Sequence, residues 1–254
     1  MPVVTGPAKG ASSDLKISQD DAGRFFVGLS WDPREAPNVE VRLDAPVQEG
    51  DTLGKIIDIM MKPLNFLRVG FWTLLKGILG DMYADSLTKK TDAKGRDKTA
   101  RQFDLDLDCY IFCKDMNYLR TVGTEDDNLI DPSRRVYHTG DNQGGLGGGD
   151  DEQVFVETKG LPAEYHHLFF VVKSDSKFTL GEFLNPKVRL TDSKTEQNAL
   201  ESTIVPEKGV AGLYNYVFCR VSRSGEGWKF FNIDEYLGDD IPWEARLPDF
   251  AKVA

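Results

Sequence analysis

Three aspartates alternate with apolar residues in the run FDLDLDC, residues 103–109. In a β-strand, successive side chains point to opposite faces, so Asp104, Asp106 and Asp108 share one face with neighbours about 6.6 Å apart. Carboxylates in such a row repel one another unless water or a cation lies between them. A solvated outer face is the simpler interpretation of this strand, and a cation site is the alternative.

A second acidic segment favours the cation site. The run HTGDNQGGLGGGDDEQ, residues 138–153, places acids on both sides of a loop that contains six glycines. Because glycine readily adopts positive φ, such a loop can turn inward and bring carboxylate and carbonyl oxygens to one point. Calcium takes six to eight oxygen ligands at about 2.3–2.6 Å and needs no sulfur or imidazole. The polar residues of this segment that suit it are Asp141, Asn142, Asp150, Asp151 and Glu152.

Two other kinds of loop site do not fit these residues. Residues 141–152 have the length of an EF-hand loop, but Leu146 stands where that motif requires glycine, and the following QVFVET predicts a strand. A phosphate-binding loop needs a lysine after its glycines, whereas acids flank this one. A solvated hairpin tip therefore remains as the alternative to a calcium site.

The composition limits the partners and the chemistry. The net charge of -10 disfavours nucleic acid as a partner. With three cysteines, three histidines and no C-x-x-C pair, the chain lacks the ligands of a typical zinc centre, and an odd number of cysteines suggests a reducing compartment. No serine, histidine and acid set stands out as a catalytic triad. Since neither a signal sequence nor a spanning apolar run is evident, we expect a cytoplasmic protein.

Most of the chain reads as short β-type runs separated by turn residues. Such a pattern, without alternating helices, predicts a mainly β fold, an antiparallel β-sandwich. We assign the sandwich to residues 14–48 and 101–235, with a flexible N-terminal tail over 1–13. The acidic C-terminal tail, residues 236–254, is either an ordered flap or a partner-binding segment, with Trp243 and Phe250 as its anchors.

Residues 49–100 interrupt the β pattern with a helical insertion and a charged linker. Apolar residues recur three and four apart, and Pro63 divides the stretch into an amphipathic helical hairpin with a basic polar face. Packing within the protein or against another subunit is one role for it, and binding to a membrane surface is the other. The residues expected to contact a membrane or partner are Phe66, Phe71, Trp72, Lys62, Arg68 and Lys76.

Four segments together resemble the TerD family of tellurium-resistance and bacterial stress proteins. They are VGLSWDP at 27–33, FDLD at 103–106, GDN at 140–142 followed by DDEQ at 150–153, and GEGWKFFNI at 225–233. The helical insertion has no counterpart in the common pattern of that family.

This resemblance implies a calcium-binding β-sandwich. Family loops usually carry acids where this chain has Leu146 and Gly148, so one of two expected calcium positions is weakened or lost. Asp108 adds a carboxylate where a small residue is more usual, and Asp32 of the W-D pair is a weaker candidate ligand. The calcium ligands carried over by motif are Asp104, Asp106, Asp141, Asn142, Asp150, Asp151 and Glu152.

The leading functional hypothesis is a noncatalytic calcium-binding scaffold of a tellurium-resistance or stress-response system. Its expected partners are proteins of a resistance complex, with a second copy or the inner face of the membrane as further partners through residues 51–83. One alternative is a calcium-dependent membrane-surface module that docks through the insertion. The other is a metal-dependent enzyme that acts on phosphoesters, although no general base or phosphate-binding arginine is evident.

Overall fold

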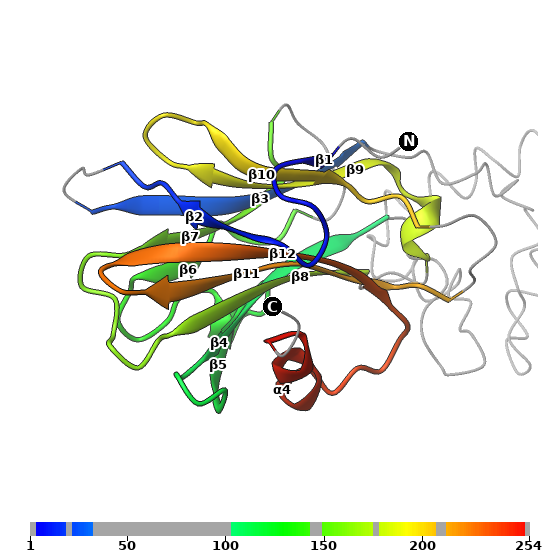
Figure 1. The fold of residues 1–254 in the computed structure, drawn as a ribbon. Helices are drawn as coiled ribbons and strands as arrows, with labels where there is room; N and C mark the ends of the chain where they lie inside the picture. The colour runs from blue at the N-terminus through cyan, green and yellow to red at the C-terminus, as the bar shows by residue number, and fades with distance from the viewer. Residues whose placement is uncertain are drawn as a thin grey trace, which may run out of the picture. The chain divides into compact units, whose positions relative to one another are not determined.

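The chain forms two six-stranded antiparallel sheets that pack face to face (Figure 1). The structure is a computed structural model, and it describes residues 4–18, 22–32, 103–142, 149–174, 178–206 and 212–251. This architecture confirms the predicted antiparallel β-sandwich.

The first sheet contains the strand that carries the VGLSWD run and the strand that follows the glycine loop. Its strands alternate between the two faces, as in the VFVE run of residues 154–157, where Val154 and Val156 are buried and Phe155 and Glu157 lie on the outer face. In order across the sheet, its strands are β1 (Val4–Thr5), β10 (Asn198–Thr203), β9 (Leu184–Asp192), β3 (Arg24–Asp32), β7 (Glu152–Glu157) and β6 (Val136–His138).

The second sheet contains the acidic strand. Its two longest strands form a hairpin at residues 224–227, where Gly225 adopts a positive φ of 59°. In order across the sheet, its strands are β2 (Ser12–Leu15), β12 (Gly227–Leu237), β11 (Asn215–Ser224), β8 (His167–Ser174), β4 (Leu105–Phe112) and β5 (Tyr118–Val122).

Alternation along β4 decides what faces the core between the sheets. Leu105, Leu107 and Cys109 are fully buried in that core, where aromatic residues of both sheets also meet. Asp106 and Asp108 have exposed fractions of only 6% and 4%, although they point to the other side of the strand. The predicted alternation is therefore present, but its acidic face is covered and not solvated.

The C-terminal segment covers part of the outer face of the second sheet. It contains the short helix α4 (Trp243–Arg246) and the 3-10 helix η3 (Leu247–Ala251), and Figure 1 shows α4 beside this sheet. Leu247 is fully buried there, and Trp243 and Phe250 pack on the same apolar cluster. Within the described residues, the segment thus has the form of an ordered flap. The other two 3-10 helices are η1 (Asp126–Asn128) and η2 (Leu180–Glu182).

The N-terminal residues contribute to both sheets. Residues 4–5 pair with β10 as strand β1, and β2, which begins at Ser12, pairs with β12. The prediction of a flexible tail over residues 1–13 is therefore wrong for residues 4–5 and 12–13, which pair in the sheets. The backbone explains this difference, because the Gly10 N–H donates to the Asn232 carbonyl at 2.7 Å and the Asn232 N–H donates to the Ala11 carbonyl at 3.0 Å.

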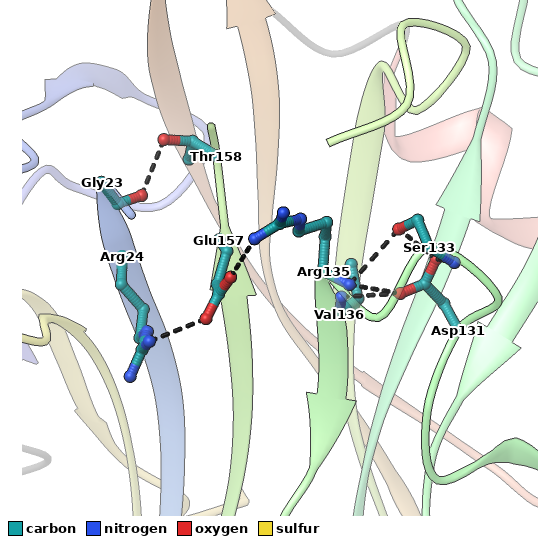
Figure 2. Close-up of polar contacts among 8 residues, drawn as sticks. All are labelled: Gly23, Arg24, Asp131, Ser133, Arg135, Val136, Glu157 and Thr158. Carbon is teal, nitrogen blue, oxygen red and sulfur yellow. Dashed lines mark hydrogen bonds and ion pairs between the residues drawn. The ribbon is translucent and has the colours of Figure 1, made fainter. Parts of the chain in front are cut away.

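Ion pairs on the outer face of the first sheet connect its neighbouring strands (Figure 2). Glu157 of β7 accepts from the Arg24 guanidinium at 2.7 Å and from the Arg135 guanidinium at 2.5 Å. In the turn before β6, Asp131 accepts from the backbone N–H groups of Arg135 and Val136, both at 2.8 Å. These contacts hold the β6 end of the sheet, which leads directly into the glycine loop.

The chain divides into two units, one of residues 1–34 and 102–254 and the other of residues 35–101. The sandwich belongs to the first unit. The predicted helical insertion, residues 49–100, lies outside the described residues, as do its six expected contact residues. In the described part of the chain, no helix has the length and apolar character needed to cross a bilayer.

Candidate metal site

Three carboxylates from separate elements converge at one end of the sandwich. Asp106 lies on β4, Asp141 follows β6, and Glu152 begins β7. One oxygen from each lies within 4.8 Å of the other two. Asp106 and Glu152 are buried and Asp141 is exposed, so the cluster is open to solvent on one side. The structure thereby brings together the two acidic segments that the sequence placed about thirty residues apart.

Backbone donors hold Glu152 in this position. Its Oε2 accepts from the Leu107 N–H at 2.9 Å, and its Oε1 accepts from the Asn142 N–H at 3.2 Å. Leu107 is available as a donor because β5 pairs with β4 only over Cys109–Phe112. A side chain of the first sheet therefore satisfies the uncovered edge of the second sheet. Glu152 Oε1, which accepts the one bond from Asn142, keeps a second lone pair that can bind a cation.

His138 is the closest imidazole to the cluster among the described residues. Its Nδ1 accepts from the Gly140 N–H at 3.0 Å, so the proton of the neutral ring lies on Nε2. Nε2 is 3.3 Å from Glu152 Oε2, and both side chains are fully buried. The ring therefore directs its N–H toward the Glu152 carboxylate and does not offer a lone pair to a metal.

Burial controls the protonation of the acids here. It raises the pKa of Glu152 more than His138 and the two backbone donors lower it. Burial also raises the pKa of Asp151, although the Trp31 N–H bond opposes the shift. The fold therefore leaves these carboxylates incompletely compensated, which is the condition in which an added cation gains most.

Asn142 and Asp151 lie beside the cluster and brace it. Asp151 Oδ2 accepts from the Trp31 N–H at 3.0 Å, and its Oδ1 accepts from the Asn142 side-chain amide at 3.1 Å. The backbone of Asn142 donates to Glu152, so one residue links both acids. Both were predicted as ligands, and in this structure they position the loop ends around the three converging carboxylates.

Asp150 points to the outer face of the first sheet, where it pairs with Arg189. Their closest ion-pair distance is 2.8 Å, and the Gln153 amide donates to the same carboxylate at 2.8 Å. The carboxylate lies directly over Gly28, where a Cβ atom would be 2.2 Å from Asp150 Oδ2. We therefore leave Asp150 out of the ligand set that its motif implied.

The remaining acids of the two motifs also lie outside the converging group. Asp108 pairs with Lys173 of β8 at 2.6 Å and accepts from the Tyr110 hydroxyl at 3.2 Å. Asp32 accepts from the Asn185 amide at 2.6 Å. Asp104 precedes β4 and is absent from the group formed by the described residues. Asp108 thus does not replace the loop acids that the family pattern led us to expect.

The sequence analysis did not identify Lys173 and Arg189, the cationic side chains that pair with Asp108 and Asp150. Each lies on a strand far along the chain from the acid it pairs with, so no local spacing indicates the pairing. The loop positions Leu146 and Gly148 belong to residues 143–148, which lie outside the described residues. Whether a second ion position exists in this loop stays a prediction.

The donor set of the cluster suits a hard divalent cation. Two oxygens on opposite sides of a calcium ion lie about 4.6–5.2 Å apart, so three oxygens within 4.8 Å fit around a common ion. All three are carboxylate oxygens, and no thiol or free imidazole lone pair joins them in the described residues. Calcium would complete its shell with backbone carbonyls and water at the exposed Asp141 side.

Comparison with known proteins supports what the motifs indicated. The model of the TerD domain matches residues 84–242. The chain belongs to the TerD domain family. This match includes the acidic strand and the glycine loop, so the cluster lies within the family's domain.

Relatives of known name come from several bacteria. The chain is 33% identical over 155 residues to the uncharacterised protein YceE of Bacillus subtilis, and this alignment covers 57% of this chain and 79% of YceE. It is 32% identical over 116 residues to the stress response protein SCP2 of the same organism, with 44% of this chain and 57% of SCP2 covered. The tellurium resistance protein TerD of Serratia marcescens is 28% identical over 149 residues, 55% of this chain and 73% of TerD.

Solved structures share the fold. A Streptomyces coelicolor homologue of the telluride resistance protein TerD superposes with a TM-score of 0.51 at 13% identity, covering 88% of this chain and 96% of the homologue. The protein SAV2460 superposes with a TM-score of 0.50 at 16% identity, covering 86% and 90%. At these identities the likeness concerns the fold alone.

Proposed function

We propose that this TerD-domain protein is a noncatalytic calcium-binding scaffold of a tellurium-resistance or stress-response system. The observation that carries the proposal is the convergence of Asp106, Asp141 and Glu152 from three elements onto one point. The names of the relatives support the cellular role, since they include tellurium resistance and stress response proteins. A cytoplasmic location is part of the same proposal.

Calcium would act by joining the two sheets at their loop end. Asp106 belongs to the second sheet, whereas Glu152 belongs to the first, and Asp141 comes from the loop between β6 and β7. One ion shared by the three carboxylates therefore orders the loop ends relative to both sheets. The surface presented to a protein partner then depends on calcium, which is how a protein without a catalytic centre can respond to the ion.

Calorimetric titration of metal-free protein with calcium, magnesium and zinc tests the proposal. We expect calcium to bind with the highest affinity and to raise the free energy of unfolding by about 2.7 kcal/mol at one hundred times its Kd. Preference for magnesium, together with turnover of a phosphoester substrate, would replace the scaffold with a metal-dependent enzyme. Absence of binding at millimolar calcium would remove the proposal altogether.

Two aspartates on one strand provide a matched pair of variants. Asp106→Asn removes a converging carboxylate, whereas Asp108→Asn removes one that is paired with Lys173. Both side chains are almost fully buried and lie two residues apart on β4. We expect the first variant to lose calcium affinity and the second to keep it. Equal loss in both would show that the whole acidic face binds the ion without a defined ligand set.

Amide hydrogen exchange tests the role of the ion in ordering the loop ends. Calcium is expected to slow exchange at residues 139–142 and 149–153, which flank the glycine loop, while the central strands stay unchanged. A uniform slowing across both sheets would indicate general stabilisation, and the calcium-dependent surface would then lose its support.

A further inference from the structure

A pocket lies on the outer face of the second sheet, beneath the C-terminal segment. Its volume is about 310 Å³, and residues 241–244 form one wall of it. Strands β4 and β5, Lys173 of β8 and the turn that follows β5 supply the rest of the lining. This size is near the lower end of the range for small-molecule sites, roughly 300–1,000 Å³.

Three aromatic rings line the pocket. Tyr110 of β4 is buried, Trp243 of α4 packs against it with ring centroids 5.7 Å apart, and Tyr118 of β5 has an exposed fraction of 37%. Trp243 brings its ring from the C-terminal segment, more than a hundred residues away along the chain from the two tyrosines. The pocket therefore exists only when this segment is folded onto the sheet.

Negative charge dominates the lining. Lys173 is the single cation among the lining residues, and its ammonium group lies 2.6 Å from the Asp108 carboxylate, which balances it. Two further carboxylates, those of Glu125 and Glu244, also line the pocket. Burial raises the pKa of the Tyr110 hydroxyl, and the negative charges of Asp108 and Glu244 raise it further.

Several kinds of ligand are disfavoured by this lining. The excess of carboxylates repels an anion. The acids of the pocket do not form a converging metal-ligand group, since within the described residues that geometry occurs at Asp106, Asp141 and Glu152. An uncharged apolar ligand would gain nothing from the exposed carboxylates of Glu125 and Glu244. Aromatic faces combined with carboxylates are instead the chemistry that recognises an organic ammonium group, through cation–π attraction and charge balance.

We propose that this pocket binds a small organic cation with an ammonium head group. The rings of Tyr110, Tyr118 and Trp243 contact the head group, and the carboxylates of Glu125 and Glu244 balance its charge. The site is separate from the candidate calcium cluster in its ligand chemistry and stands whether or not calcium binds. Because Trp243 belongs to the C-terminal segment, ligand binding also stabilises the docking of that segment on the sheet.

Titration of the full-length protein with choline tests this site. Choline serves as the probe because it carries a compact quaternary ammonium group. Its uncharged isostere, in which a tert-butyl group replaces the trimethylammonium group, has nearly the same shape without the charge. We expect choline to bind at least about fivefold more tightly than the isostere, as cation–π attraction at a partly exposed site implies. Equal affinity for choline and its uncharged isostere overturns the proposal.

Variants of exposed pocket residues assign the site. Tyr118→Leu and Glu244→Gln are each expected to weaken choline binding about fivefold or more, because each removes part of the attraction for the cation. Both residues are exposed, so folding is expected to survive and circular dichroism checks it. Glu226→Gln, in the β11–β12 turn away from the pocket, is the control and should bind as the unmodified protein does. Unchanged choline affinity in both pocket variants overturns the assignment.

Ethanolamine distinguishes two kinds of ammonium ligand. A site dominated by aromatic contact prefers the quaternary head of choline, whereas a site dominated by the carboxylates prefers the primary ammonium of ethanolamine, which can donate hydrogen bonds. Binding of either compound with the expected loss in Tyr118→Leu supports the proposal and identifies the head group. Failure of both compounds to bind overturns it.

Discussion

Two sets of acids in this sandwich have pKa shifts of opposite direction. In the structural set, Asp131 and Asp192 each accept several hydrogen bonds from neighbouring turns, and these donors outweigh the effect of burial and lower the pKa of each carboxyl group. In the candidate metal site, burial outweighs the donors, and the pKa values of Asp151 and Glu152 are raised. The difference lies in how many donors the fold supplies.

This comparison separates carboxylates whose hydrogen-bond donors outweigh burial from carboxylates whose donors do not. Asp131 receives four hydrogen bonds from the turn at residues 133–136 and one from the Tyr165 hydroxyl at 3.1 Å (Figure 2 shows the contacts within the turn). Such a group has its charge solvated by the protein itself. Glu152 instead lies near two other acids, Asp106 and Asp141, with one oxygen of each within 4.8 Å of the others.

Replacing Glu152 by glutamine is expected to have the largest effect on calcium. The variant keeps the size of the side chain but removes a charge and a ligand oxygen from the cluster. Calcium affinity should fall by more than about 100-fold, since even the outer partners of metal ligands account for 10–100-fold. Calorimetry measures the affinity. A variant that binds calcium as before would show that the ion lies elsewhere.

Replacing Asp131 by alanine should lower the stability of the protein without changing its calcium affinity. The Val136 N–H, in a fully buried residue, loses its acceptor, and the Arg135 N–H keeps only the Ser133 hydroxyl at 3.3 Å. The free energy of unfolding is expected to drop by about 2 to 3 kcal/mol, as measured by urea denaturation. Calcium affinity should remain unchanged within about twofold under conditions where the variant is folded. A large loss of calcium affinity would erase the distinction between the two sets of acids.

Asp150 is a third kind of acid, because it is paired with the cationic side chain of Arg189. Adding a methyl group at Gly28 tests the role of this pair. In Gly28→Ala the new Cβ would lie 2.2 Å from Asp150 Oδ2, so the carboxylate must shift, which disturbs its ion pair with Arg189. We expect a loss of about 1 to 2 kcal/mol in the free energy of unfolding and little change in calcium affinity. Asp150→Asn is the companion variant. Calcium binding that fails in both would return Asp150 to the ligand set.

The smallest expected effect concerns Asp192 and pH. Burial opposes its ionisation, but donors from Ser18 and Thr195 lower its pKa from 3.8 to about 2. Because the folded pKa is below the ordinary value, the stabilisation is fully present above about pH 4 and disappears as the pH falls through about 2. Unfolding curves of the unmodified protein and Asp192→Asn should therefore converge over this range. Calcium should not shift the range, and a calcium-dependent shift would contradict the assignment.

The fold was the most predictable part of the molecule. Alternating apolar residues in strands such as β4 and β7 and the turn residues between strands are local signals, and they predicted an antiparallel sandwich. The family was equally evident from four short motifs, and the match to the TerD domain confirmed it. The order of the strands in each sheet was not predictable in this way, because pairing partners such as β3 and β9 lie more than 150 residues apart.

The site was predictable only in outline. Residue types and glycine content indicated that the acids of residues 104–108 and 141–152 meet around a cation, and three of them do converge. Strand alternation could not separate Glu152 from Asp150 and Asp151, because those two residues precede β7 and because Asp150, two residues before Glu152, would share its face on a regular strand. Contacts with distant strands decide the difference: Asp150 pairs with Arg189 of β9, while Glu152 accepts from the Leu107 N–H of β4.

Local chemistry in the chain therefore settles which segments are strands, which face of each is apolar and which residue types gather near the loop. The closed sandwich determines which acid pairs with a cationic side chain, as Asp150 does, and which accepts from backbone N–H groups, as Asp131 does. It also determines which acid lies near other acids, as Glu152 does. The physical reason is that the charge state and partners of a carboxylate depend on burial and on groups within a few ångströms, and here those groups come from distant strands.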